Sequence, residues 1–297
     1  MSDLPHRVGQ AAAESCWNRM HETECILERI SKEASDVMTS KPEPLLRELG
    51  SANLETMACC GVKNPVHDGR RQKHCWMRAY FKKGLRAKVL LTPDNRQCGY
   101  IEYLPGEFAW RGVDASGYLF IHCLWTFYRQ YQRRGFGTSM VQAVMDDARK
   151  EGRNGVAVVT RDRPWLAGAG IFLASGFEIV DTAPPDYKLL VKKLNPSAPD
   201  PVFKGGWERK LLKYGRGLTI IRSRQCPHIA KFAAEIALVA EEEYGLKPRI
   251  VELKSHRDAQ NAPTPYAVFA VILNGRLLTD HQVSCTRFRN LMKRNLP

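Results

Sequence analysis

The sequence of 297 residues lacks any run of about 18 consecutive apolar residues, so no membrane-spanning helix is predicted. Its first residues, MSDLPHRVGQAAAESCWNRM, have no uninterrupted apolar core after a basic start, which argues against a secretory signal. The nine cysteines show no paired spacing, as is typical of reduced thiols. We therefore expect a cytoplasmic protein that is neither membrane-bound nor built on a disulfide framework.

Acidic residues are also scarce relative to basic ones, with 31 Asp and Glu against 45 Lys and Arg and a formal net charge of +14. This excess favours anionic partners. The basic residues are spread along the chain instead of forming one aromatic-interleaved block, so nucleic acid is not expected as the partner. A nucleic-acid binder is kept as an alternative, and its affinity would fall steeply with salt.

The length allows two domains, and a proline-rich segment suggests where they meet. The stretch NPSAPDPVFKGG carries three prolines and marks a boundary near residue 195. We expect an N-terminal extension over 1–45 with one amphipathic helix, a first domain over 46–195, a linker over 196–215 and a second domain over 216–297. The oligomeric state is left open.

The first domain is organised around a strand, a basic turn and a helix between Tyr118 and Lys150. The turn ends in QRRGFG, residues 132–137, where glycines let several backbone N–H groups converge ahead of a helix N-terminus. Such a turn is an anion site. It has no third glycine for a dinucleotide fingerprint and no Gly-Lys-Ser/Thr for a Walker loop. A tight connection without a ligand is the alternative interpretation.

The surrounding pattern predicts an α/β (α+β) fold with a mixed sheet flanked by helices. A strand is weakly indicated near ETMACCGV, and a helix is expected over 70–85. The expected strands and helices that follow are strands at 86–91, 97–104 and 118–127, a helix after the turn, a strand at 155–160, a short helix at 169–176 and a final strand pair, EIVD and YKLLVKKL. In the strand at 118–127, alternation places Tyr118, Phe120, His122 and Leu124 on one face.

This order, with Q-x-x-G-x-G in the turn and IFLASGF after the fifth strand, resembles the GNAT family of N-acetyltransferases. The resemblance implies that acetyl-CoA binds as acyl donor, with its diphosphate on the backbone of the turn and its pantetheine amides on the strand before it. The cofactor-binding residues implied are Leu124, Trp125, Thr126, Arg129, Gln132, Arg133, Arg134, Gly135, Phe136, Gly137 and Thr138.

Acetyl transfer needs a neutral amine, a polarised thioester and a proton donor for the thiolate. Many family members supply that donor from a tyrosine four residues before the Gly-Phe, but this sequence has Phe172 there. Tyr187 is a substitute candidate. Glu102 and His122 are candidate bases, although His122 is equally well explained as a hydrogen-bonded histidine in a central strand. The acceptor implied is a small amine, reached by direct transfer.

The second domain resembles a thioredoxin-like fold, with strand 217–222, a helix opened by Gln225-Cys226-Pro227-His228, strand 249–254, a hairpin turned at Asn274-Gly275 and a last helix. Thr264-Pro265 stands where that fold keeps a cis-proline, and Ile229 stands where a second redox cysteine would fall. A helix N-terminus is expected to lower the pKa of Cys226.

The pairing of both domains, with GYLFIHCLW, Cys59-Cys60-Gly61, TAPPDYKLLV and QNAPTP, resembles the YoaP-type acetyltransferases over about residues 52–294. The cysteines and histidines near residue 60 do not have zinc spacing, so no metal is predicted. The alternative function is a thiol-active or CoA-sensing protein that uses Cys226 without transferring an acetyl group.

Overall fold

The computed structural model describes residues 45–57, 60–62, 64–127, 129–162 and 164–296. The N-terminal extension with its expected helix lies outside the described residues, as does Cys59. From Leu45 onward the chain forms one compact unit. In the described part of the chain, no helix is long and apolar enough to cross a membrane.

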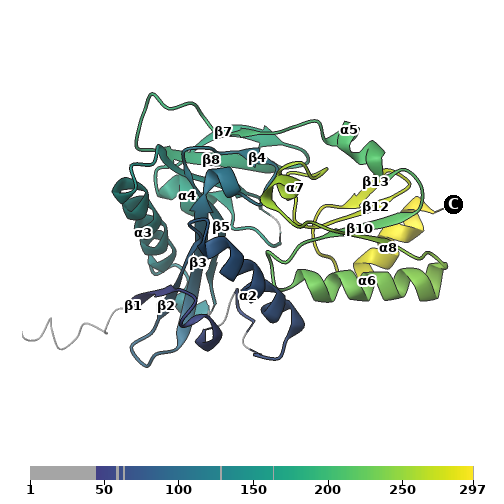
Figure 1. The fold of residues 1–297 in the computed structure, drawn as a ribbon, viewed down its shortest axis with the longest axis horizontal. Helices are drawn as coiled ribbons and strands as arrows, with labels where there is room; N and C mark the ends of the chain where they lie inside the picture. The colour runs from purple at the N-terminus through teal and green to yellow at the C-terminus, as the bar shows by residue number, and fades with distance from the viewer. Residues whose placement is uncertain (1–44, 58–59, 63, 128, 163, 297) are drawn as a thin grey trace, which may run out of the picture. The chain divides into compact units, whose positions relative to one another are not determined.

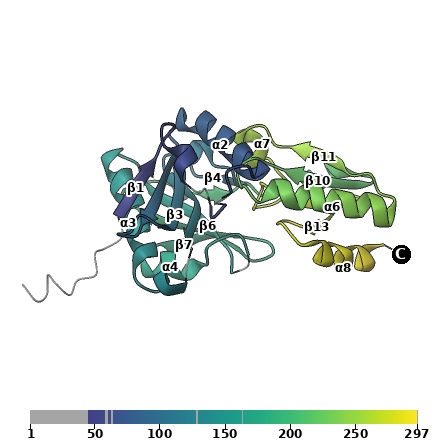
Figure 2. The same ribbon diagram turned by 90° about the horizontal axis from the view of Figure 1, so that it is seen from below.

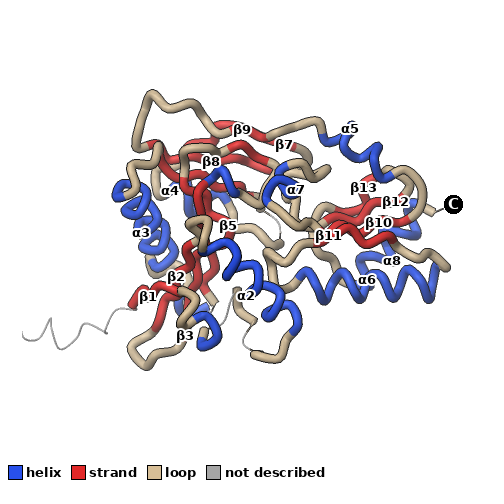
Figure 3. The backbone as a smooth tube through the Cα atoms, in the orientation of Figure 1, coloured by secondary structure: helices blue, strands red, loops and turns tan. Residues whose placement is uncertain are grey.

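A seven-stranded sheet forms the first half of this unit (Figures 1 and 3). Only the neighbours β5 and β6 are parallel, and all other neighbouring pairs are antiparallel. In sheet order the strands are β1 (Leu45–Leu49), β2 (Arg86–Leu91), β3 (Gln97–Pro105), β5 (Leu119–Thr126), β6 (Gly155–Thr160), β8 (Tyr187–Lys193) and β7 (Glu178–Ala183). The prediction of a mixed α/β sheet flanked by helices is confirmed. The first strand, however, lies at Leu45–Leu49 and not near ETMACCGV, where Leu54–Thr56 form a 3-10 turn.

Helices cover both faces of this sheet. On one face, α3 (Phe136–Lys150) and α4 (Ala169–Ala174) pack through Met140, Val144 and Phe172. The opposite face is covered by α2 (Asp68–Phe81), whose Trp76, Met77 and Tyr80 are buried as their helical spacing predicts.

The sequence alternation in β5 is interrupted at His122. Glu102 of β3 pairs with Cys123, but the next residue, Tyr103, pairs with Ile121, so His122 is an extra residue in its strand. Such a bulge reverses which face the later side chains reach. Phe120 and Cys123 therefore pack on the α2 side and Leu124 on the α3 side. The prediction that Leu124 shares a face with Phe120 is wrong for this reason.

The second half contains a four-stranded sheet in the order β11 (Arg249–Glu252), β10 (Leu218–Arg222), β12 (Ala270–Leu273) and β13 (Arg276–Thr279). β10 and β11 are parallel, and β12 runs antiparallel to β10 and β13. Figure 2 shows α6 (Ile229–Tyr244) and α8 (Cys285–Asn295) on the same side of this sheet, and the short helix α7 (His256–Gln260) follows β11.

Apart from α7, which was not predicted, the elements were expected at these places, and Asn274 and Gly275 have the positive φ angles of a tight hairpin turn. The thioredoxin-like assignment itself stays a prediction. One detail of it is wrong: among the described residues, the cis peptide bond is at Pro184-Pro185, so the bond before Pro265 is trans.

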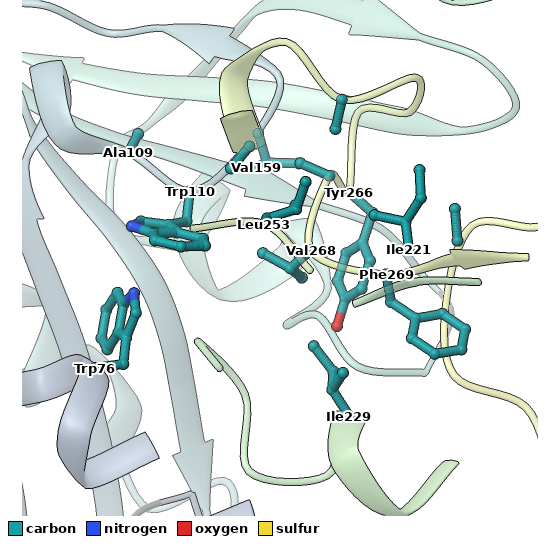
Figure 4. Packing of buried hydrophobic residues seen from close by; sticks show 14 of the residues in the cluster. Trp76, Ala109, Trp110, Val159, Ile221, Ile229, Leu253, Tyr266, Val268 and Phe269 are labelled. Carbon is teal, nitrogen blue, oxygen red and sulfur yellow. The ribbon is translucent and has the colours of Figure 1, made fainter. Parts of the chain in front are cut away.

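The segment 196–215 is ordered and joins the two halves. It contains β9 (Val202–Phe203), which pairs with β4 (Val113–Asp114), and α5 (Trp207–Leu211). Gly112 donates its N–H to the carbonyl of Pro265 at 3.1 Å. One cluster of buried residues runs from Trp76 and Trp110 to Tyr266, Ile229 and Phe269, as Figure 4 shows. The two halves therefore share a continuous core.

Candidate active site

The parallel strands β5 and β6 part halfway along their length. They pair from Leu119–Val156 to Ile121–Val158, yet β5 continues to Thr126 and β6 to Thr160. On their outer edges these later residues pair with β3 and β8. Their inner edges face an opening in the sheet, and a ligand with amide groups can add there as a strand does. Leu124, Trp125 and Thr126, the residues predicted to bind the pantetheine arm, lie on this edge. Their role in binding stays a prediction.

The basic turn follows β5 and leads directly into α3. Arg129–Tyr131 form a 3-10 turn, and Gly135 caps α3 with φ +79°. The first hydrogen bond of the helix runs from the N–H of Ser139 to the carbonyl of Gly135 at 2.9 Å. The N–H groups before Ser139 precede that ladder, so they are the orphan donors of a helix start. Arg129, Gln132, Arg133 and Arg134 are exposed around them.

A cavity of about 630 Å³ extends from the strand opening toward the second half of the chain. Leu124, Trp125 and Val159 line it at the opening, and Gln225, Cys226 and Tyr266 line it at the far end. Phe172, which stands in place of the usual acid, is buried and also lies on its wall. The segment before α6 therefore closes a cavity that begins between β5 and β6.

A fully buried carboxylate, that of Glu102, lies on the cavity wall. Its Oε2 is 2.5 Å from the Lys73 ammonium and accepts from the Tyr100 hydroxyl at 2.5 Å, and its Oε1 accepts from the Gln225 amide at 3.0 Å. Burial alone would raise the pKa of Glu102, but Lys73 and His122 outweigh it and lower the pKa to about 2. Glu102 is therefore ionised at neutral pH.

The bulge residue His122 lies beside this carboxylate. Its Nε2 accepts from the N–H of Trp110 at 2.9 Å, which places the proton of the neutral ring on Nδ1, 3.7 Å from Glu102 Oε1. Burial lowers the pKa of His122 to about 4, although the nearby Glu102 carboxylate raises it in part. The ring is neutral at pH 7, with Nε2 occupied by the backbone.

Tyr187 is not among the residues that line this cavity. Its hydroxyl donates to Asp280 at 2.8 Å and accepts from Arg161 at 3.0 Å. Burial and the Asp280 carboxylate raise the pKa of Tyr187. The structure thus brings Glu102 and His122 together and places Tyr187 in a separate network that joins β8 to the loop after β13.

Cys226 lies three residues before α6 begins, in contact with Cys60. This contact and its burial raise the pKa of the thiol well above its usual value. The expectation of a lowered pKa is therefore wrong for the reduced protein, because the neutral neighbours and the apolar wall disfavour a thiolate more than the helix favours it.

Two residues of the site were missed from the sequence. Lys73 carried a signal, because it occupies the same helical face as Trp76, Met77 and Tyr80, where a lysine needs a buried partner. Cys60 was considered only as part of the Cys59-Cys60-Gly61 motif and as a zinc ligand, and no role in this site was predicted for it. In the described part of the chain, no group of three or more His, Cys, Asp or Glu residues is arranged to hold a metal ion.

Comparison with known proteins agrees with the resemblance drawn from the sequence. A family model described as YoaP-like matches residues 249–290. The chain is 26% identical over 249 residues to a Bacillus subtilis protein named "Uncharacterized N-acetyltransferase YoaP", an alignment that covers 82% of this chain and 97% of that protein. These matches confirm the similarity to YoaP-type proteins and support the prediction of an acyltransferase.

Solved structures named as acetyltransferases are also similar to about half of the chain. YhbS from Escherichia coli, in complex with CoA, is 12% identical and aligns over 54% of this chain and 89% of its own, with a TM-score of 0.36. YncA from Salmonella typhimurium, with acetyl-CoA, is 16% identical and aligns over 54% of this chain and 99% of its own, with a TM-score of 0.40.

Proposed function

We propose that this protein is an N-acetyltransferase that moves an acetyl group from acetyl-CoA directly to the primary amine of a small acceptor. The observation that carries the proposal is the parting of β5 and β6, because the resulting opening leads into a cavity with a buried carboxylate on its wall, and the turn that begins α3 directly follows β5. The similarity to a protein named as an N-acetyltransferase supports the same class of reaction.

Acetyl-CoA binds with its diphosphate at the backbone N–H groups from Arg133 to Thr138. Neutral donors at a helix start hold phosphate without a buried cation, and the helix dipole favours the negative charge. Arg129 and Arg134 lie exposed beside them and add charge-assisted contacts to the outer phosphates. The pantetheine arm pairs with the free edge of Leu124, Trp125 and Thr126.

The acceptor amine enters the inner part of the cavity, whose wall is largely apolar and aromatic, with Phe127, Trp165 and Phe172 among its residues. The amine nitrogen attacks the thioester carbon, the C–S bond breaks, the nitrogen loses one proton and the CoA thiolate gains one. The negative charge of Glu102 assists the loss of the amine proton, which passes to solvent because a carboxylate with a pKa of about 2 does not retain it. His122 accepts from the N–H of Trp110 and so fixes the bulge at the cavity wall, while Lys73, Tyr100 and Gln225 hold Glu102 in place.

Calorimetric titration with acetyl-CoA tests the donor site through two matched glycines. Gly135 and Gly152 lie at opposite ends of α3, and both have positive φ angles and open space where a side chain would begin. We expect Gly135→Glu to abolish binding and Gly152→Glu to leave it unchanged, since the backbone strain is alike and only the first charge meets the phosphates. Equal loss in both variants, or binding retained by Gly135→Glu, would refute the phosphate site.

The candidate acid Tyr187 is tested separately. Because its hydroxyl lies in the network with Asp280 and Arg161, we expect Tyr187→Phe to lower the free energy of unfolding by about 1–3 kcal/mol. The kcat for acetyl transfer should change little. A kcat that falls by orders of magnitude at unchanged stability would instead make Tyr187 the acid.

A thiol-active protein that uses Cys226 without acetyl transfer is the second candidate, favoured by the contact between Cys226 and Cys60. Cys226→Ser separates the two functions. Acetyl transfer survives this change if the first proposal holds, and all activity vanishes if the second does.

A further inference from the structure

Three thiols from distant parts of the sequence line the inner end of the cavity. They are Cys60 in the loop before α2, Cys123 in β5 and Cys226 before α6. Cys60 is the middle one: its Sγ lies 3.4 Å from Sγ of Cys123, and its thiol also contacts that of Cys226. Ile229 stands where a second redox cysteine would follow Cys226, and Cys226 instead contacts a cysteine from the first half of the chain.

The loop that carries Cys60 is held in an uncommon conformation. Cys60 has φ +49°, in the left-handed region that residues with a side chain rarely adopt, and Gly61 follows with φ +81°. The carbonyl of Cys60 faces Nε2 of His228 at 3.3 Å, and the ring of Phe127 lies against Gly61. Contacts from both halves of the chain therefore fix the thiol where it meets Cys123 and Cys226.

We propose that Cys60 is the centre of a redox site that forms a reversible disulfide with Cys123, with Cys226 as its second partner. The two sulfur atoms need to approach from 3.4 Å to a bond length of about 2.05 Å, a movement within the reach of side-chain rotation and a small loop shift. The cavity admits the oxidant, a low-molecular-weight disulfide such as oxidised glutathione.

The reaction runs by thiol–disulfide exchange. The Cys60 thiolate attacks one sulfur of the small disulfide and releases one small thiolate, and the Cys123 thiolate then displaces the second from Cys60. Two protein thiols and one small disulfide become one protein disulfide and two small thiols. The contact with Cys123 raises the pKa of Cys60, so the first step quickens as the pH rises toward that pKa.

Peptide mapping of the full-length protein tests the site. Trypsin places Cys60 in residues 48–63, Cys123 in residues 112–129 and Cys226 in residues 225–231, and a Cys59→Ser background leaves one cysteine in each peptide. After oxidised glutathione and alkylation, we expect the peptides 48–63 and 112–129 to be cross-linked, and dithiothreitol to release them. Adding Cys123→Ser should shift the cross-link to 225–231, and adding Cys60→Ser should abolish it.

Cys75→Ser is the matched control, because Cys75 is exposed on α2 outside the cavity, and this change should leave the cross-link intact. Cys226→Ser should also keep the bond between Cys60 and Cys123. The proposal is overturned if Cys60 remains fully alkylatable, or carries only glutathione, under conditions that glutathionylate Cys75. Loss of every cross-link in Cys226→Ser would equally contradict the pairing with Cys123.

The disulfide also has a consequence for catalysis, which rests on the proposed function. A bond between β5 and the loop before α2 narrows the acceptor end, so oxidation should lower the rate of acetyl transfer, and dithiothreitol should restore it. Peptide mapping needs no acetyl transfer, and acetyl-CoA titration needs no disulfide. Failure of one proposal is therefore distinguishable from failure of the other.

Discussion

The basic turn before α3, called the mouth of the site below, and the inner end of the cavity hold charged groups in different ways. The turn from Arg129 to Gly135 is exposed and offers backbone N–H groups backed by a helix dipole. At the inner end, Glu102 and Lys73 are almost completely buried, and side chains from both halves of the chain satisfy them. The mouth can therefore accept a charged ligand from water at little cost in stability, whereas the inner end depends on contacts that the folded chain must complete.

The largest effect should follow from breaking the buried ion pair. Lys73→Met leaves the Glu102 carboxylate buried without its cation, which typically costs about 3–5 kcal/mol in the free energy of unfolding. The double variant Lys73→Met/Glu102→Gln removes both charges, so it should lose less than the sum of the single losses. Urea denaturation measures all three.

The exposed pair Arg71 and Asp68, on the same helix as Lys73, provides the control. Arg71→Met should change stability very little, because water and salt already screen that pair. Strictly additive losses at Lys73 and Glu102, or an equal loss at Arg71, would show that the inner end is no more dependent on pairing than the surface is.

The next largest effect is a loss of folding stability as the pH falls. Burial lowers the pKa of folded His122 from 6.5 to about 4, so the unfolded chain binds the proton first as the pH falls. Because of His122, the free energy of unfolding therefore decreases as the pH falls from 6.5 to about 4. Below pH 4.5, Glu102 causes a further decrease, because its pKa is lowered from 4.5 to about 2. His122→Gln should reduce the slope of the free energy of unfolding between pH 6.5 and 4 by up to about 1.4 kcal/mol per pH unit.

Urea titrations of wild type and His122→Gln at pH 7, 6, 5 and 4.5 measure this difference, and subtraction removes the contribution of the other histidines. Parallel curves would mean that His122 binds its proton over the same pH range in the folded and the unfolded chain. The lowering of its pKa by burial, and with it a neutral ring that still accepts from Trp110 at pH 5, would then be wrong.

The smallest effect is expected at the mouth. Arg134 is exposed and its guanidinium lies 5.2 Å from the ring of Phe136, so Arg134→Ala removes only a screened phosphate contact. The Kd for acetyl-CoA should rise by a factor of roughly 2 to 5, as for a loss of about 0.5–1 kcal/mol, and the difference should shrink at high salt. Arg149→Ala, near the other end of α3, is the control. If Arg134→Ala weakened acetyl-CoA binding as much as Gly135→Glu does, the phosphates would be bound mainly by side chains and not by the backbone.

The two regions also differ in how far the sequence predicts them. The turn, its glycines and the flanking strand and helix are local, so periodicity and spacing were sufficient to place them. The inner end depends on contacts between residues far apart: Lys73 with the Gln225 carbonyl, Glu102 with the Gln225 amide, and Cys60 with Cys226. No local pattern carries such pairings. The bulge at His122 was missed for a similar reason, since it is visible only in the register with β3.

The bonds from Gln225 to both Lys73 and Glu102 affect any attempt to divide this protein. A fragment that ends near residue 195 would keep the whole seven-stranded sheet and the turn, and would look like a complete catalytic domain. It would nevertheless open the ion pair to water and remove one wall of the acceptor cavity. Fragments cut there are therefore poor substitutes for the full chain in any search for the acceptor, even where they bind acetyl-CoA.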